Sequence, residues 1–95
     1  MNSESREQTV FVSGDVTVNT VTAPLYRNYC QQLAALGTDI RVDFSGVGTA
    51  DSACLSLLAA AWRQSRNGAA VSFSAIPPSV ALLAELYDVQ DWISS

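Results

Sequence analysis

The sequence contains no histidine and no lysine, and each absence excludes a class of function. Without histidine, no serine or cysteine can be activated by a neighbouring imidazole base. Without lysine, and with a net charge of −4, the surface is a poor match for phosphate backbones and for anionic lipid head groups. The composition therefore argues against nucleic-acid binding and against direct attraction to a membrane, and favours a protein partner.

Cysteine is also scarce, since Cys30 and Cys54 are the only two in the chain. Both lie in apolar segments with helical spacing, and their separation does not match a metal-binding motif. We expect both thiols to be reduced and partly buried, with Cys54 as a packing residue rather than a nucleophile. The spacing of Asp15, Asp43 and Asp51 does not require a metal site either. We therefore expect no metal, no cofactor and no enzymatic activity.

The chain has no apolar run close to the length of roughly 18 residues that predicts a membrane span. Its first eight residues are polar and lack the basic start and apolar core of a secretory signal. A composition of 48% hydrophobic and 15% charged residues is typical of a globular domain. We expect a single domain over residues 1–95 that lies in the cytoplasm, with no direct membrane insertion.

The spacing of apolar residues predicts alternating strands and helices. Residues that alternate or favour strands predict three β-strands, over residues 9–13, 40–44 and 70–75. Apolar residues at helical spacing predict three helices, over residues 24–36, 52–67 and 79–87. This order predicts an α/β fold in which the helices mostly cover one face of a sheet.

Two residues support the predicted bounds of the first helix. For the first and last residues of the chain, the sequence allows two structures each. Pro24 suits the first turn of the first helix, where its missing N–H has no cost, and Gly37 suits the position that ends it. Residues 1–8 either fray or add a short edge strand. Residues 88–95 carry enough apolar side chains to pack as a last short turn or as an edge strand.

The second predicted helix has one clear apolar stripe. Leu55, Leu58, Ala59 and Trp62 recur at the spacing i, i+3, i+4 and i+7, so we expect this face to be buried. We also expect Trp62 and Trp92 to lie in the core, because a small domain needs their apolar volume.

The loop before this helix carries Gly46 and Gly48, which resemble the start of a dinucleotide-binding motif. Asp51 occupies the third glycine position, where its carboxylate would oppose a pyrophosphate, so we reject this interpretation. A P-loop is excluded because no Gly-Lys-Ser/Thr follows. We expect the glycines to serve the backbone angles of a tight turn between strand and helix.

Asp51 and Ser52 at the helix start admit a structural and a functional interpretation. Either side chain can be the N-cap that accepts a hydrogen bond from an early helix N–H. A phosphate on Ser52 would also be tolerated by the positive end of the helix dipole, although Asp51 beside it would oppose the added charge. The site can therefore act as a polar docking point or as a charge switch.

The segment from residue 42 to residue 58, VDFSGVGTADSACLSLL, resembles the signature of STAS domains. In that family a strand ending in Asp, an aliphatic or aromatic residue and Ser is followed by a short loop, Asp, Ser or Thr, two small residues and an amphipathic helix. The turn at residues 13–15, the helix start at 22–25 and the ending at 86–89 match in order. The resemblance implies a STAS-like α/β fold with a mixed sheet of about four strands and helices mainly on one face.

Two branches of that family compete. In anti-sigma-factor antagonists, the hydroxyl at the Ser52 position is phosphorylated by a partner kinase, the anti-sigma factor, and the unmodified helix start binds that kinase. Here Ala53 and Cys54 replace the second serine and the glycine that usually follow. The other branch is similar to the small STAS subunit of the bacterial lipid-asymmetry (Mla) ABC transporter, which binds the cytoplasmic ATPase subunit. The compact length and the ending Leu-Tyr-Asp-Val favour this second branch.

The resemblance implies a site at the start of the second predicted helix. Ser52 is the expected partner-binding or phosphorylatable residue, and it would contact the ABC transporter ATPase subunit and hold the chain at the periphery of the inner membrane. Leu57 and Ala61 are expected to be exposed and to supply apolar contact. The further expected partner-binding residues are Thr49, Asp51, Ala53, Ser56 and Leu57.

Overall fold

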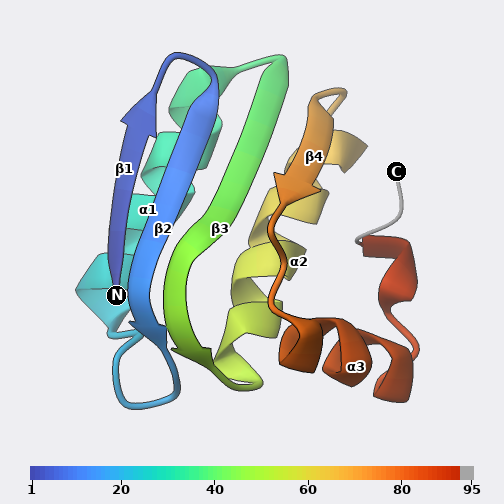
Figure 1. Ribbon diagram of the computed structural model, residues 1–95. Helices are drawn as coiled ribbons and strands as arrows, with labels where there is room; N and C mark the ends of the chain where they lie inside the picture. Colours follow the sequence, from blue (N-terminus) through green and yellow to red (C-terminus); the bar gives the residue numbers. More distant parts are fainter. Residues whose placement is uncertain (93–95) are drawn as a thin grey trace.

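A mixed sheet of four strands forms one layer of a computed structural model that describes residues 1–92 (Figure 1). The strands lie in the order β1-β2-β3-β4 and comprise Asn2–Arg6, Thr9–Val16, Asp39–Ala50 and Ala70–Ser74. The helices are α1 (Ala23–Leu36), α2 (Ala53–Arg66) and α3 (Pro78–Leu86), followed by a single 3-10 turn, η1 (Gln90–Trp92). No helix within residues 1–92 is long and apolar enough to span a membrane.

The strand pairing confirms the mixed sheet. β1 is antiparallel to β2, whereas β2 pairs with β3, and β3 with β4, in parallel. β1 lies at the sheet edge, so residues 1–8 add an edge strand rather than fray. At the other end of the chain, η1 shows that residues 90–92 form a short turn, and Ile93 lies outside the described residues.

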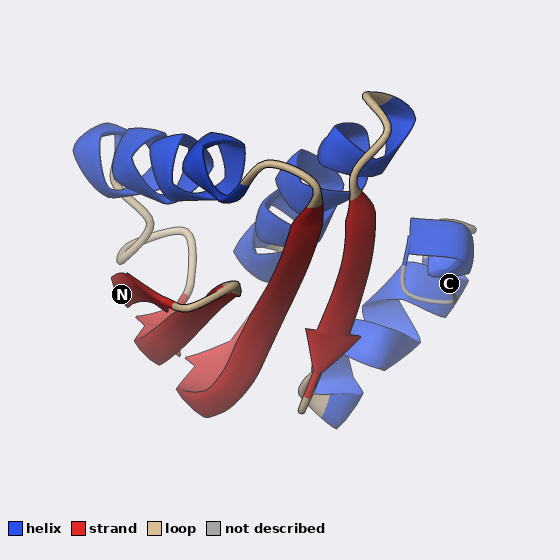
Figure 2. Ribbon diagram, turned by 90° about the horizontal axis from the view of Figure 1, so that it is seen from above, coloured by secondary structure: helices blue, strands red, loops and turns tan. Residues whose placement is uncertain are grey.

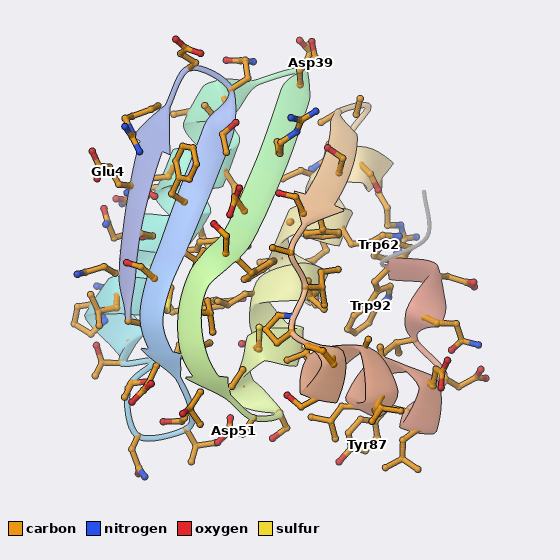
Figure 3. All side chains as sticks on the ribbon, viewed as in Figure 1. Glu4, Asp39, Asp51, Trp62, Tyr87 and Trp92 are labelled. Atoms are coloured by element: carbon orange, nitrogen blue, oxygen red, sulfur yellow. The ribbon has the colours of Figure 1, made fainter. Side chains whose placement is uncertain are left out.

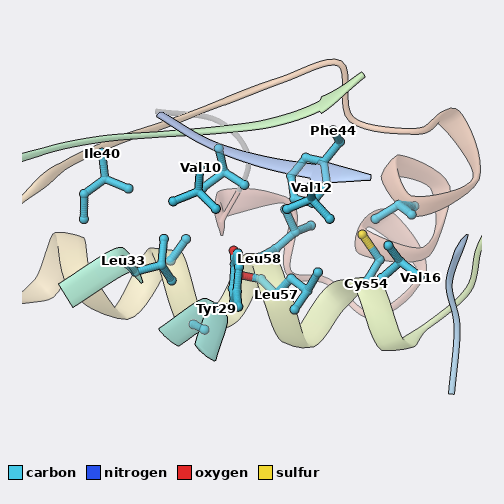
Figure 4. Close-up of a cluster of buried hydrophobic side chains, with 14 residues drawn as sticks. Val10, Val12, Val16, Tyr29, Leu33, Ile40, Phe44, Cys54, Leu57 and Leu58 are labelled. Carbon is cyan, nitrogen blue, oxygen red and sulfur yellow. The ribbon is translucent and has the colours of Figure 1, made fainter. Parts of the chain in front are cut away.

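α1 and α2 cover one face of the sheet, in line with the prediction that the helices mostly do so, whereas α3 lies to the side of β4 and packs against α2 (Figure 2). The alternation of apolar and polar residues along β3 explains why one face is covered. Ile40, Val42 and Phe44 are buried under the helices, while Arg41 is exposed. The buried side chains form one core between sheet and helices (Figure 4). Its largest fully buried members are Tyr29, Phe44, Leu33, Leu57, Leu58, Val10, Val12, Val16, Val42 and Val80.

β3 is longer than the sequence predicts, and the glycine segment belongs to it. The expected strand ended at residue 44, but β3 continues to Ala50 and pairs with β2 as far as Val16. Neither Gly46 nor Gly48 has a positive φ, so the predicted tight turn is wrong. Gly46 instead allows close approach, because an added Cβ would lie 2.9 Å from the Cβ of Ser13.

α2 buries a different face from the one expected. Leu57 and Ala61 are fully buried, so the prediction that they are exposed contact residues is wrong. Leu55 and Ala59, placed in the buried stripe, are only partly buried. Nearly every residue of the first turns of α2 is apolar, so the pattern alone permits two neighbouring faces, and packing against the sheet selects one.

α1 matches its predicted start and end, and it is tied to α2 by a buried hydrogen bond. Pro24 lies in the first turn, and Gly37 follows the helix with a φ of 80°. The hydroxyl of Tyr29 donates to the backbone carbonyl of Leu57 at 2.8 Å. Burial raises the pKa of Tyr29 well above its ordinary value, which keeps the phenol protonated for this contact.

The two tryptophans lie at the margin of the core. Their rings pack against each other with centroids 6.1 Å apart, and both are half-buried. Trp92 packs against the core cluster as a partly buried residue, and the guanidinium of Arg66 lies 5.4 Å from the centroid of the Trp62 ring. The prediction that both are core residues is therefore wrong, because each stays partly exposed.

The orientation of α2 gives the first testable prediction. Leu57→Ala should lower the free energy of unfolding by about 2–5 kcal/mol, because it opens a cavity in the core. The matched change Leu82→Ala, at a side chain that is 66% exposed, should alter it by less than about 1 kcal/mol. Urea denaturation of both variants measures the difference. Similar losses for the two variants would contradict this orientation of α2.

Candidate functional site

The start of α2 is held by the carboxylate of Asp51, which joins two segments far apart in the sequence. Its Oδ1 accepts a hydrogen bond from the backbone N–H of Ala53 at 2.8 Å, and its Oδ2 accepts one from the N–H of Val18 at 3.2 Å. The first contact satisfies an early N–H of the helix. The second fixes the β2–α1 loop beside it, so Asp51 is the capping residue that the sequence allowed.

Ser52 occupies the N-cap position but does not cap the helix with its side chain. Its backbone has helical angles, with φ −59° and ψ −19°, and its hydroxyl makes no capping hydrogen bond. The residue is exposed. Ser52 therefore presents a hydroxyl to solvent at the positive end of the helix dipole, and the fold does not use it.

A second carboxylate, that of Asp15, holds the end of β3 in place by a hydrogen bond. The Oδ1 of Asp15 accepts a hydrogen bond from the backbone N–H of Thr49 at 3.1 Å. An added Cβ at Gly48 would lie 3.1 Å from the same oxygen, so a side chain there would crowd the contact. Asp15 thus positions the end of β3, and Asp51 positions the β2–α1 loop and the start of α2.

A shallow, widely open groove of about 440 Å³ lies between the β2–α1 loop and the starts of α1 and α2. Val18, one of its lining residues, is 69% exposed. The hydroxyl of Ser56 turns back to the helix and donates to the carbonyl of Ala53 at 2.6 Å. The lining is mainly apolar and consists of Val18, Val21, Thr22, Ala23, Tyr26, Ala53 and Ser56.

The structure brings most of the predicted site residues together at one end of the sheet. Thr49, Ser52 and Ser56 are exposed, and Asp51 and Ala53 are partly exposed. Leu57 is the exception, because it points into the core and cannot reach a partner. Five groove residues from the first half of the chain were not among the predicted site residues: Val18, Val21, Thr22, Ala23 and Tyr26. The only sequence signal for Val18 and Val21 was the irregular spacing of the valines that follow β2.

The electrostatics of this end do not favour nucleophilic chemistry. Burial raises the pKa of the Cys54 thiol to about 12, and the negative charge of Asp51 adds to the increase. The thiol therefore stays protonated at neutral pH, when a nucleophile would need to be a thiolate. Within residues 1–92 no group of three or more metal-ligating side chains lies close enough together to hold a metal ion.

A larger cavity of about 820 Å³ lies at the opposite end of the sheet. It is bordered by the β1–β2 turn, by the first residues of β3 and β4, and by Trp62 and Trp92. Its charged side chains are Glu7 of the β1–β2 turn, Asp39 and Arg41 of β3, and Asp91 of η1. We place the candidate site at Ser52, because its hydroxyl is exposed and makes no capping hydrogen bond.

Comparison with known proteins supports the architecture. A family model described as "Mlab, STAS domain" matches residues 1–94. Among solved structures, the unphosphorylated form of the anti-sigma factor antagonist SpoIIAA is similar, with a TM-score of 0.62 and 14% identity. That similarity covers 90% of this chain and 81% of SpoIIAA. No curated protein sequence gives a match. At this identity the structural similarity concerns the fold alone.

The division of roles at the helix start predicts different effects for neighbouring substitutions. Asp51→Ala should lower the free energy of unfolding by about 1 kcal/mol, because an N–H of α2 loses its acceptor. Ser52→Ala should change it by less than about 0.5 kcal/mol, because the hydroxyl has no role in the fold. Thermal or urea unfolding compares the two. A loss for Ser52→Ala as large as that for Asp51→Ala would mean that Ser52 caps the helix.

The buried thiol predicts a loss of stability at alkaline pH. The pKa of Cys54 is raised from 9.0 to about 12 in the folded state, so the folded chain keeps a proton that the unfolded chain has lost. The contribution is complete below pH 9.0 and decreases as the pH rises towards about 12. Urea denaturation across this range should show a steeper decline for the wild type than for Cys54→Ala. Equal slopes would place the thiol in contact with solvent.

Proposed function

The chain belongs to the STAS domain family, and from this we propose that it is a non-catalytic regulatory or assembly subunit of an ABC transporter. In this role the loop and helix that begin at Ser52 bind the cytoplasmic ATPase of a phospholipid-trafficking transporter. The observation that carries the proposal is the exposed hydroxyl of Ser52, which contributes no capping hydrogen bond to the fold. The description of the matching family, "Mlab, STAS domain", supports the transporter branch.

The geometry supports a docking surface with a polar and an apolar part. Thr49 and Ser52 offer hydroxyl groups that fix the register of a partner by hydrogen bonds. The groove between Val18, Tyr26 and Ala53 accepts an apolar side chain of the ATPase. Asp51 positions both parts, because its carboxylate bonds to the loop and to the helix. A surface held in place before binding loses little entropy on association.

A binding role is also consistent with the chemistry of the site. The chain has no histidine, and the Cys54 thiol is protonated at neutral pH because of its raised pKa. The hydroxyl of Ser52 has Asp51 as its sequence neighbour, but that carboxylate is engaged with backbone N–H groups. The subunit would accordingly act through contact with the ATPase, at the periphery of the inner membrane.

A second candidate function is that of an anti-sigma factor antagonist switched by phosphorylation of Ser52. The similarity of the fold to unphosphorylated SpoIIAA favours it, as does the exposure of the hydroxyl at a helix N-terminus. The partner would then be an anti-sigma factor kinase. Ala53 and Cys54 count against this role, because they replace the second serine and the glycine that usually follow the phosphorylated residue.

The proposal predicts the behaviour of Ser52→Asp. The variant should stay folded, but it should lose most of its affinity for the ATPase, because a charge replaces a neutral hydroxyl at the contact. Affinity purification of tagged chain from cells, followed by titration with the purified ATPase, measures the loss. Ser5→Asp is the matched control, since it adds the same charge on the exposed edge strand β1.

The outcomes separate the two candidate functions. Recovery of an ABC ATPase with the wild type and with Ser5→Asp, but not with Ser52→Asp, supports the transporter role. Recovery of a serine kinase that phosphorylates Ser52 supports the antagonist role instead. Unchanged binding of the ATPase to Ser52→Asp would show that Ser52 lies outside the interface.

A further inference from the structure

α3 carries apolar side chains on two opposite faces. Val80 and Ala84 are fully buried against the body of the protein. Leu82 and Leu86, one helical turn apart on another face, are 66% and 76% exposed, and Tyr87 directly after the helix is 55% exposed. We refer to Leu82, Leu86 and Tyr87 as the outer stripe of α3.

The outer stripe is not needed to hold α3 in place. A helix on the surface of a globular domain normally pairs an apolar inner face with a polar outer face. Among the residues of α3, only Ser79 and Glu85 are polar, so the helix is apolar nearly all round. Such a helix is typical of an element covered on both sides. Exposed apolar clusters of this kind mark interaction surfaces.

The charged side chains that adjoin the outer stripe have one sign. Glu85 lies in α3 and Asp88 follows Tyr87 directly, and both are exposed. The next charged residue, Asp91, borders the larger cavity instead. The five arginines of the chain all precede α3. An apolar stripe beside acidic side chains is complementary to an amphipathic helix with lysine or arginine next to its apolar positions.

We propose that the outer stripe of α3 is a second docking surface, and that it binds a basic amphipathic helix of the partner ATPase. This inference rests on the proposed function and adds a contact separate from Ser52. The leucines are one turn apart, which matches apolar anchors at i and i+4 on a facing helix. The acidic side chains then pair with basic residues at the edge of the contact.

The charge distribution disfavours two other occupants. A symmetric contact between two copies would bring the acidic residues of one α3 near those of the other, and such like-charge contacts are unfavourable. An anionic lipid surface would be repelled by the same side chains.

The position of α3 allows one partner to reach both surfaces. α3 packs beside α2 at the end of the molecule where α2 begins (Figure 1). Asp51 and Tyr87 both lie at this end in Figure 3. A single ATPase can therefore contact the Ser52 surface and the outer stripe together, and the two contacts would add to the affinity.

The test compares three sets of variants by titration with the purified ATPase. The double variant Leu82→Gln/Leu86→Gln should bind at least about tenfold more weakly than the wild type, because the apolar contact is lost. The control Ala34→Gln/Ala35→Gln, at exposed positions of α1, should bind as the wild type does. Glu85→Gln should weaken binding at low salt, whereas Glu7→Gln, in the distant β1–β2 turn, should not.

The results distinguish this inference from the proposed function. Loss of binding by Ser52→Asp with full binding by Leu82→Gln/Leu86→Gln would overturn the second surface and leave the proposed function standing. If the wild type does not bind the ATPase, the proposed function fails. In that case, binding of a synthetic helical peptide with leucine at i and i+4 and flanking lysines tests the outer stripe without the ATPase.

Binding of this peptide is measured by the changes that it causes in the backbone amide chemical shifts of the protein, by nuclear magnetic resonance. Shifts at residues 82, 86 and 87 that disappear in Leu82→Gln/Leu86→Gln support a basic amphipathic partner. Shifts elsewhere, or equal binding of a peptide with glutamate in place of lysine, overturn it. Dimerisation of the wild type through α3, detected by sedimentation and abolished in the double variant, would also overturn it by showing a second copy as the occupant.

Discussion

The packing of β3 against the helices is the constraint on which the rest of the structure depends. β3 is a central strand, paired with β2 on one side and β4 on the other, and its inward side chains form the middle of the core. Phe44 packs on Phe73 of β4 with ring centroids 6.2 Å apart. Because α2 follows β3 directly and must cover it, its buried face is fixed by the sheet. The start of α2 is consequently left at the end of the sheet where β3 ends, and there Ser52 is exposed.

At this end of the sheet, some side chains stabilise the fold and their neighbours are free to bind a partner. Asp51 satisfies backbone groups of the loop and of the helix, and Asp15 does the same for the end of β3. Ser52 and the outer stripe of α3 contribute little to the fold by comparison. The exposed apolar side chains of the outer stripe are better suited to contact with a partner than to packing within the domain. Both proposed surfaces follow from this division.

Local sequence patterns located the strands and helices but not the faces of every helix. The alternation in β3 allowed one solution, so Ile40 and Phe44 lie where the pattern places them. In α2, apolar residues occupy two adjacent faces, and the choice between Leu55 and Leu57 depends on how the helix packs. The resemblance of the segment around Ser52 to STAS domains predicted the mixed sheet, which the pairing confirms.

The sequence by itself determined the order of the elements, the lack of an imidazole base and the polar start of α2, because these depend on residue type and local spacing. Only the tertiary structure decided that Asp51 caps the helix while Ser52 stays free, since the second bond of Asp51 reaches Val18, 33 residues away. It likewise decided that Leu57 is buried and that Leu82 is exposed. Contacts between segments distant in the chain determine which of several similar side chains face solvent, and a local pattern carries no information about them.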